Sequence, residues 1–168
     1  AAPKQHLLLI DALARMRDRL WVLKLVGDGP ELTKVISAVK LAGLESRVHF
    51  LGPRDDVPEI LSGCDIFVLP SLYEGLPISI IEAMRAGLPV VASNVGGVSE
   101  LVNSETGILV ESEGKPSLEE ALLALIEDGE CRQQLGSAGR KVFECSFRSD
   151  EMVSRYMKIY QSVITDTQ

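Results

Sequence analysis

Short apolar runs alternate along the chain with longer segments in which apolar residues recur every three or four positions. Leu9, Leu13 and Met16 show the longer spacing and predict an amphipathic helix over residues 4–17. The same kind of pattern predicts further helices at 31–41, 56–61, 77–85 and 96–101. The short runs, which end at Gly, Pro or Ser, predict strands at 21–26, 48–51, 65–69, 90–92 and 108–110.

Strands that alternate with helices indicate a parallel sheet whose two faces are covered by crossover helices. We therefore expect an α/β fold of the Rossmann-like, doubly wound type, in a single domain over residues 1–168. Beyond residue 116 the pattern is helical throughout, and Ser117 with Glu120 forms a capping-box pair. Four side chains are expected on one face of a final helix over 148–164: Met152, Tyr156, Tyr160 and Val163.

Composition and charge exclude several classes of function. Apolar residues make up 46% of the sequence, which is enough for a sizeable core. The net charge of −7 predicts no nucleic-acid partner, because phosphate backbones require clustered Lys and Arg. The three cysteines show no CxxC spacing and favour reduced thiols in a cytoplasmic protein. The sequence opens at Ala1 without an initiator Met, so we expect it to be a piece of a longer protein.

The densest candidate chemistry lies between a predicted strand and a predicted helix, in the stretch PSLYEGLPISIIEAM over residues 70–84. Ligands of parallel sheets bind beyond the carboxyl ends of the strands, where this loop lies. A helix start offers free N–H groups and a positive dipole end, which suit a phosphate. Because Pro77 has no N–H, the available amides are those of Gly75, Leu76, Ile78 and Ser79.

Two carboxylates flank this anion site. Glu74 lies in the loop and Glu82 lies inside the helix, and a carboxylate accepts paired hydroxyls well. One anion site between two hydroxyl acceptors indicates a nucleotide-sugar. The alternative is that Glu74 serves only the helix dipole and that Glu82 belongs to a solvated face. The apolar neighbours of Glu82, such as Ile81 and Ala83, argue against a broadly polar face.

The spacing of Glu74 and Glu82 within PSLYEGLPISIIEAMRAGLPVVAS closely resembles the C-terminal, donor-binding domain of the family 4 retaining glycosyltransferases, which have the GT-B fold. The resemblance covers nearly the whole chain. Further segments that match the family in the same order are KQHLLLIDA at 4–12, LVGDGP at 25–30, VHFLG at 48–52, NVGGVSELV at 94–102 and TGILV at 106–110.

The resemblance implies a role for each candidate residue. Glu82 would bind the ribose hydroxyls of the donor, and Glu74 would contact the donor sugar. Lys4 would pair with the diphosphate and offset the charge of the leaving group, so that Glu74 and Lys4 are the expected catalytic residues. The amides of 75–79 would hold the diphosphate and the sugar. Leu51 and Arg54 fall where the family contacts the base.

The reaction implied is transfer of a sugar, with retention, from a UDP- or GDP-sugar to an acceptor that binds the N-terminal domain. Neither a metal nor another cofactor is expected. Polysaccharide or glycolipid assembly is the family setting, and the parent protein is expected in the cytoplasm, with peripheral attachment to the inner membrane face as an option.

The sequence also departs from the family. The family's strand and Gly-Arg pair before the Lys4 segment are absent, and Gln5 replaces a glycine. That strand is central in the family's sheet, so its loss is expected to leave two strand edges unpaired. We expect the isolated chain to be catalytically inactive.

Three other functions compete with this interpretation. A non-catalytic GT-B-like domain would bind a partner protein, and another GT-B enzyme, such as a nucleotide-sugar epimerase, would carry more titratable groups in its cleft. A dinucleotide site at 27–32 is disfavoured, because Leu32 occupies the third glycine position of the GxGxxG pattern.

Overall fold

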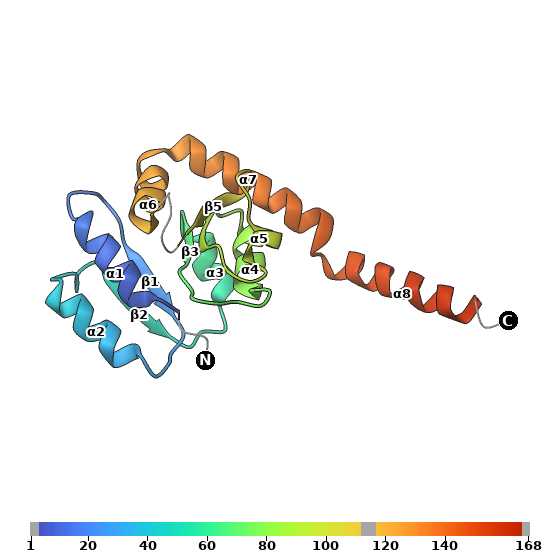
Figure 1. Cartoon of the computed structure of the whole chain (residues 1–168), viewed down its shortest axis with the longest axis horizontal. Helices are drawn as coiled ribbons and strands as arrows, with labels where there is room; N and C mark the ends of the chain where they lie inside the picture. The colour runs from blue at the N-terminus through green and yellow to red at the C-terminus, as the bar shows by residue number, and fades with distance from the viewer. Residues whose placement is uncertain (1–3, 112–116, 166–168) are drawn as a thin grey trace.

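The helices and strands follow one another in the predicted order. The computed structural model describes residues 4–111 and 117–165 (Figure 1). In chain order the elements are α1 His6–Arg15, β1 Leu23–Val26, α2 Leu32–Leu41, β2 Val48–Gly52, α3 Val57–Ser62, β3 Phe67–Leu69, α4 Ile78–Ala86, β4 Val90–Ser93, α5 Val98–Leu101, β5 Gly107–Val110, α6 Leu118–Glu127, α7 Gly129–Ser146 and α8 Ser149–Thr165.

The strands pair in parallel and form two sheets. β1 pairs with β2, and Leu23 lies opposite Val48. The second sheet has the order β3-β4-β5, in which β4 is flanked on both sides. Parallel pairing of consecutive strands requires the crossover helices that the sequence predicts. The expected α/β fold class is therefore confirmed.

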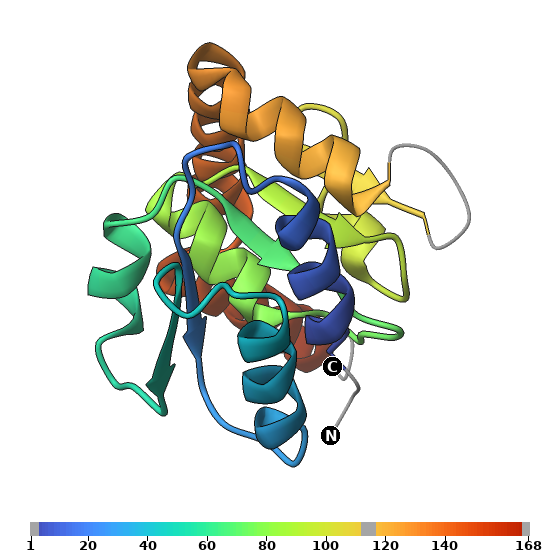
Figure 2. The ribbon, with the colours of Figure 1, turned by 90° about the vertical axis from the view of Figure 1, so that its left-hand side faces the viewer.

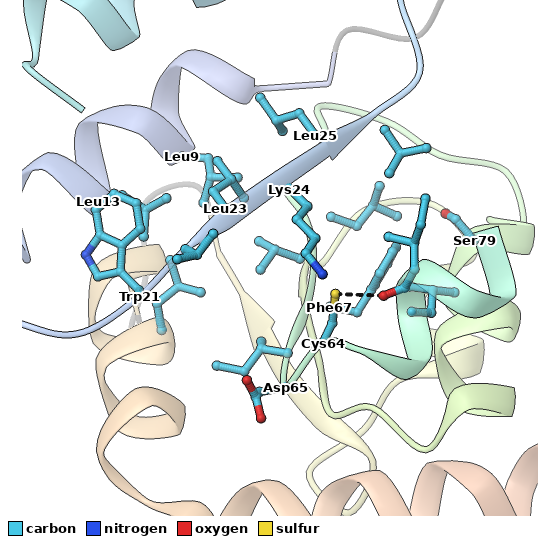
Figure 3. A pocket seen from close by; sticks show the side chains of 18 of the residues that line it. Leu9, Leu13, Trp21, Leu23, Lys24, Leu25, Cys64, Asp65, Phe67 and Ser79 are labelled. Atoms are coloured by element: carbon cyan, nitrogen blue, oxygen red, sulfur yellow. Dashed lines mark hydrogen bonds between the residues drawn. The ribbon is translucent and has the colours of Figure 1, made fainter. Parts of the chain in front are cut away.

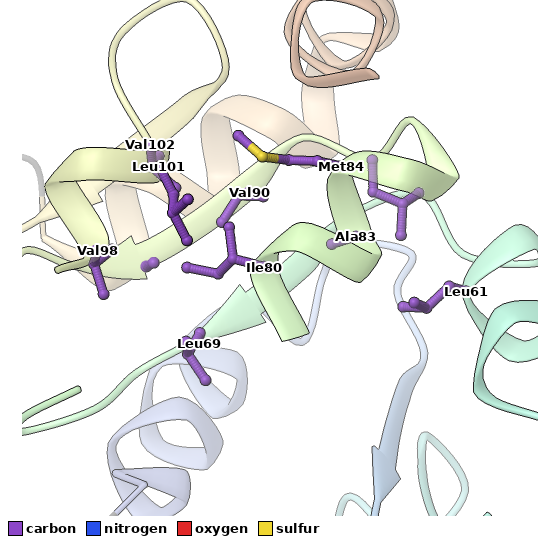
Figure 4. Close-up of a cluster of buried hydrophobic side chains, with 11 residues drawn as sticks. Leu61, Leu69, Ile80, Ala83, Met84, Val90, Val98, Leu101 and Val102 are labelled. Atoms are coloured by element: carbon purple, nitrogen blue, oxygen red, sulfur yellow. The ribbon is translucent and has the colours of Figure 1, made fainter. Parts of the chain in front are cut away.

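Helices cover both faces of the three-stranded sheet. Val90 and Ala92 of β4 belong to a buried cluster that contains Ile80 and Met84 of α4 (Figure 4). Val91, between them, points to the other face and packs with residues of α1 and α6. Successive side chains of a strand point to opposite faces, so β4 serves both clusters at once. This arrangement is the doubly wound packing expected from the sequence.

α1 joins the two sheets. Its Ile10 packs with residues of α2 and β2. Its Leu9 and Leu13 pack with α6 and with Val91 of the other sheet. Figure 2 shows α1 between α2 and α6, which it contacts on either side. Because the apolar residues of α1 recur at i, i+3 and i+4, the helix packs against both sheets.

A groove of about 880 Å³ separates β1 from β3. Its walls include Leu23 and Leu25 of β1, Phe67 of β3, and Leu9 and Leu13 of α1 (Figure 3). Within the described residues, β1 and β3 each pair along one side only, and their other sides face this groove. The expected pair of unpaired strand edges is confirmed.

Strands β1 and β3 are shorter than predicted, and β1 is more exposed. β1 begins at Leu23 rather than at residue 21, and its side chains alternate between half-buried and exposed instead of being buried throughout. Val26, for example, is 44% exposed. β3 is reduced to Phe67–Leu69. Both strands border the groove, so each has a hydrogen-bonding partner on one side alone.

The C-terminal part is helical, as predicted. The capping box is present: the Glu120 amide donates to Ser117 Oγ at 3.2 Å, and the Ser117 amide donates to Glu120 Oε2 at 2.8 Å. α8 extends away from the rest of the chain (Figure 1). Tyr156 and Tyr160 stack on one of its faces with ring centroids 6.4 Å apart. The side chains of Met152 and Val163 lie outside the described residues.

Candidate functional site

The start of α1 is tied to the end of β3. The Gln5 amide donates to the Pro70 carbonyl at 2.6 Å, and Lys4 forms an antiparallel bridge with Ser71. These contacts join segments far apart in the sequence. They carry the Lys4 side chain to the loop that follows β3, which is one of the loops at the carboxyl edge of the sheet.

Lys4 and Glu74 form an ion pair in this loop. Lys4 Nζ lies 2.6 Å from Glu74 Oε1, and Ser71 Oγ donates to the same oxygen at 2.7 Å. The Glu74 side chain is 11% exposed and that of Lys4 is 37% exposed. Burial raises the pKa of Glu74, but the hydrogen bonds from Lys4 and Ser71 and the Lys4 charge outweigh burial and hold that pKa below its usual range. Glu74 is therefore ionised at neutral pH.

Two glycines after β4 pack closely against the backbone of the Glu74 loop. A Cβ atom on Gly96 would lie 1.8 Å from the Glu74 carbonyl oxygen, and Gly96 has a φ of +54°. A Cβ on Gly97 would lie 2.5 Å from the Gly75 carbonyl oxygen, to which the Gly97 amide donates at 3.0 Å. Only glycine allows the two loops to approach so closely. The sequence pair Gly96-Gly97 thus sets the position of Glu74 and Gly75.

The start of α4 is open to an acceptor. Pro77 is its N-cap residue and makes no side-chain capping hydrogen bond. The first N–H groups of a helix have no partner within the helix, so those of Ile78 and Ser79 remain available. Gly75 and Leu76 are exposed just before them. The helix dipole adds positive potential at this end, which favours an anion there.

Glu82 and Ser79 lie on the side of α4 that borders the groove. Both residues line the groove, and so does Lys4. Glu82 is exposed, whereas Ala83 beside it is fully buried in the core. The structure therefore brings Lys4, Ser79 and Glu82 to one cavity, with Glu74 bound to Lys4 at its edge. It does not turn Glu82 into the apolar interior.

Leu51 lies in β2, and Arg54 follows the end of that strand. Leu51 is half-buried within β2, and Arg54 is exposed. Arg54 Nε donates to Asp56 Oδ1 at 2.6 Å, and this pairing raises the pKa of Arg54. Neither Leu51 nor Arg54 is among the described residues that line the groove.

Ser71 and Ser93 contribute to the site, although the sequence motifs predicted no role for either side chain. Ser71 is 2% exposed, its hydroxyl binds Glu74, and its amide donates to Ser93 Oγ at 3.0 Å. A signal for Ser71 exists in the sequence, because it lies three residues before Glu74 in a loop. The link to Ser93 crosses between two strands and leaves no local signal.

Neither a metal-binding cluster nor a membrane-spanning helix is found among the described residues. No three His, Cys, Asp or Glu side chains within residues 4–111 and 117–165 gather in a way that could hold a metal ion. In the same part of the chain, no helix combines the length and the apolar character that crossing a bilayer demands.

Two of the curated sequences that are similar to this chain come from bacteria. N-acetyl-alpha-D-glucosaminyl L-malate synthase of Bacillus anthracis is 36% identical over 145 residues, which cover 86% of this chain and 38% of that protein. N,N'-diacetylbacillosaminyl-diphospho-undecaprenol alpha-1,3-N-acetylgalactosaminyltransferase of Campylobacter jejuni is 37% identical over 120 residues, which cover 70% of this chain and 31% of that protein. The chain thus spans less than half the length of these relatives.

Solved structures share the fold. Sucrose-phosphate synthase from Thermosynechococcus elongatus matches with a TM-score of 0.86 and 28% identity, over 97% of this chain and 43% of that one. The HepE protein of Anabaena in complex with UDP matches with a TM-score of 0.84 and 30% identity, over 94% of this chain and 45% of that one. The expected likeness to GT-B glycosyltransferases is confirmed.

The match to a protein family covers most of the chain. Residues 1–128 match the family described as glycosyl transferases group 1. The segments that carry the site all lie inside this range: Lys4, the loop around Glu74, the start of α4 and the Gly96-Gly97 turn. This chain therefore belongs to the group 1 glycosyltransferases.

Proposed function

We propose that residues 1–168 are the donor-binding domain of a longer, retaining glycosyltransferase, which transfers a sugar from a UDP- or GDP-sugar. One observation carries the proposal: the Lys4–Glu74 ion pair lies beside the uncapped start of α4, on a groove that Glu82 also lines. The similar HepE structures of Anabaena, which contain UDP or UDP-glucose, support a nucleotide-sugar donor.

The diphosphate is assigned to the start of α4. The amides of Gly75, Leu76, Ile78 and Ser79 supply donors at the positive end of the helix dipole. Lys4 supplies the positive charge at the same place and offsets the charge that develops on the leaving nucleoside diphosphate. Donors that are already in place cost little reorganisation when the bond breaks, which makes this electrostatic effect the main contribution to catalysis.

The two carboxylates are assigned to hydroxyl groups. Glu74 is ionised and lies next to the helix start, so it accepts from a hydroxyl of the donor sugar. Glu82 is exposed at the groove, where it accepts from the ribose hydroxyls. Glu74 and Lys4 are therefore the proposed catalytic residues, and Glu82 is a binding residue. The mechanism assigned to these groups uses no metal and no cofactor.

The base is assigned to the end of β2. Leu51 is half-buried and Arg54 is exposed there, and the Arg54 guanidinium is already paired with Asp56. Backbone groups are therefore the contacts expected for the base. The base is thus assigned to the end of β2, and the diphosphate and the ribose are assigned to α4.

We infer that the groove between β1 and β3 holds a strand that precedes Lys4 in the parent protein. Within residues 4–111 and 117–165, each groove edge is a strand that lacks a partner on the groove side, and the wall side chains are largely apolar. Such a strand would run parallel to β1 and end at the site. The 168-residue chain alone is expected to be inactive.

The acceptor is assigned to the N-terminal domain of the parent, in polysaccharide or glycolipid assembly in the cytoplasm. The Campylobacter jejuni relative is named for a diphospho-undecaprenol acceptor, which favours activity at the inner membrane face.

A second candidate function is that of a non-catalytic domain that binds a protein partner. Exposed apolar side chains on α8, such as Met157 and Ile159, favour it.

Calorimetric titration of the full-length parent with UDP, GDP and ADP tests the proposal. We expect UDP or GDP to bind saturably. Glu82→Ala should weaken that binding more than tenfold, or about 1.4 kcal/mol, because a hydrogen bond to a charged group is worth that much. Glu45→Ala, which removes an exposed carboxylate elsewhere, is the control and should leave the affinity unchanged. Absence of nucleotide binding would favour the protein-binding candidate, and full affinity in Glu82→Ala would contradict the ribose assignment.

A further inference from the structure

Glu74 Oε1 accepts two hydrogen bonds whose donors differ in exposure and in side-chain length. Lys4 reaches it on a long stem, and that side chain is 37% exposed. Ser71 is 2% exposed, and its hydroxyl lies on a short side chain beside the end of β3. Both donors use Oε1, so Oε2 has no partner among the described residues and remains for a hydroxyl of the donor sugar.

Ser71 is fixed from two sides. Its amide donates to Ser93 Oγ at 3.0 Å, which anchors it to the end of β4. Its bridge with Lys4, next to the 2.6 Å bond from the Gln5 amide to the Pro70 carbonyl, anchors it to the start of α1. None of these links involves the Lys4 ammonium. The Ser71 hydroxyl therefore stays in place when the Lys4 side chain moves.

Under the proposed function, Lys4 has two competing partners. The structure pairs it with Glu74, and the proposed function assigns it to the donor diphosphate, which carries more negative charge than one carboxylate. Among the described residues, Lys4 is the charged group that acts on Glu74. When it leaves, a carboxylate that is only 11% exposed would have no remaining donor unless another group held it, and an unpartnered buried charge is unfavourable.

We propose that Ser71 is a positioning residue that keeps the Glu74 carboxylate ionised and in place while Lys4 passes to the diphosphate. This proposal rests on the proposed function of Lys4 and Glu74. Ser71 acts through Glu74, since its hydroxyl bond goes to that carboxylate. The arrangement gives Lys4 and Glu74 separate tasks once the donor has bound.

The first test needs no nucleotide. Carbon-13 NMR titration of the Glu74 carboxyl in the full-length parent, assigned by loss of its signal in Glu74→Gln, measures its pKa directly. Lys4→Met reproduces the departure of Lys4. Adding Ser71→Ala to Lys4→Met should raise the Glu74 pKa by about one unit, because a hydrogen bond to the charged form is lost. A change below about 0.3 unit would overturn the proposal.

The second test is kinetic, with UDP-glucose and GDP-glucose as donor probes. Ser71→Ala should lower kcat about tenfold, leave KM for the donor and the affinity for UDP or GDP within about twofold, and cause no further loss in a Glu74→Ala background. Equal losses in both backgrounds would show a merely structural role and overturn the proposal. Thr106→Val removes another hydroxyl from a residue that is 2% exposed and should leave kcat unchanged.

The two tests separate two failures. A parent enzyme that binds no nucleotide and transfers no sugar contradicts the proposed function. The Glu74 titration still decides whether Ser71 holds the carboxylate, because it does not depend on turnover.

Discussion

At the scale of single residues, the candidate site contains an ion pair beside a third, exposed carboxylate, that of Glu82. Lys4 and Glu74 pair at 2.6 Å, and Ser71 shares the same carboxylate oxygen. A half-buried pair of this kind is sensitive to the loss of one partner, because the other charge is left poorly solvated. The effect of pH on this ion pair and the effect of Gly96 on the position of Glu74 can both be measured.

Glu74 should make stability depend on pH in the acid range. Its pKa is lower in the folded chain than its ordinary value of 4.5, so the unfolded chain binds more protons in this window. The stabilisation is present above about pH 4.5 and is lost as the pH falls through the lowered pKa. In urea unfolding of the 168-residue chain, Glu74→Gln should cost about 1 kcal/mol at pH 6.5 and less at pH 3. A cost that does not change with pH would contradict the role of the Glu74 charge.

Glu74→Ala should separate chemistry from nucleotide binding. The carboxylate is assigned to the donor sugar, so kcat of the parent enzyme should fall about tenfold or more while UDP or GDP binds with nearly unchanged affinity. Steady-state kinetics and calorimetry on the same variant make the comparison. Equal losses in turnover and in nucleoside diphosphate affinity would move Glu74 from the sugar to the diphosphate.

Gly96→Ala should displace the Glu74 loop. The added Cβ would meet the Glu74 carbonyl oxygen at 1.8 Å, and the backbone has a φ of +54°. We expect a loss of about 1–3 kcal/mol in stability together with lower turnover. Gly29→Ala is the matched control, because its Cβ meets nothing within 4 Å. Similar effects of both substitutions would show that close approach of the two loops is not required.

At the scale of elements, periodicity and capping signals predicted the fold well wherever an element has neighbours on all sides. β4 matches its predicted run closely and is buried on both faces. β1 and β3, the two strands that border the groove, are shorter than their apolar runs. The contact between Lys4 and Glu74 spans 70 positions, so no local pattern could predict it, and the family resemblance alone placed both residues in one site.

The capping box of α6 provides a test at this scale. Ser117→Ala removes the acceptor of the Glu120 amide and should lower the free energy of unfolding by about 1 kcal/mol. Ser37→Ala, within the exposed surface of α2, should change it by less than about 0.5 kcal/mol. Urea denaturation of both variants makes the measurement. Equal losses in the free energy of unfolding for the two variants would contradict a specific stabilising role of the cap.

At the scale of the whole molecule, the groove between β1 and β3 is the feature from which we infer a preceding strand in the parent protein. α1 spans the two sheets, yet an apolar cavity of about 880 Å³ and two strand edges lie between them. We expect an N-terminal extension that carries the parent's preceding strand to raise the free energy of unfolding by at least about 2 kcal/mol. Fully burying a single aliphatic side chain is worth about that much.

The extension should act only as a strand. A matched extension with proline at its central position supplies similar apolar residues but cannot complete the ladder, so it should recover little of the gain. Hydrogen exchange should then show new protection of backbone amides along β1 and β3 with the natural extension alone. If both extensions stabilise the chain equally, the groove binds apolar groups without regard to strand pairing. That result would contradict the inferred strand, because the stabilisation would then come from apolar contact alone and not from pairing with β1 and β3.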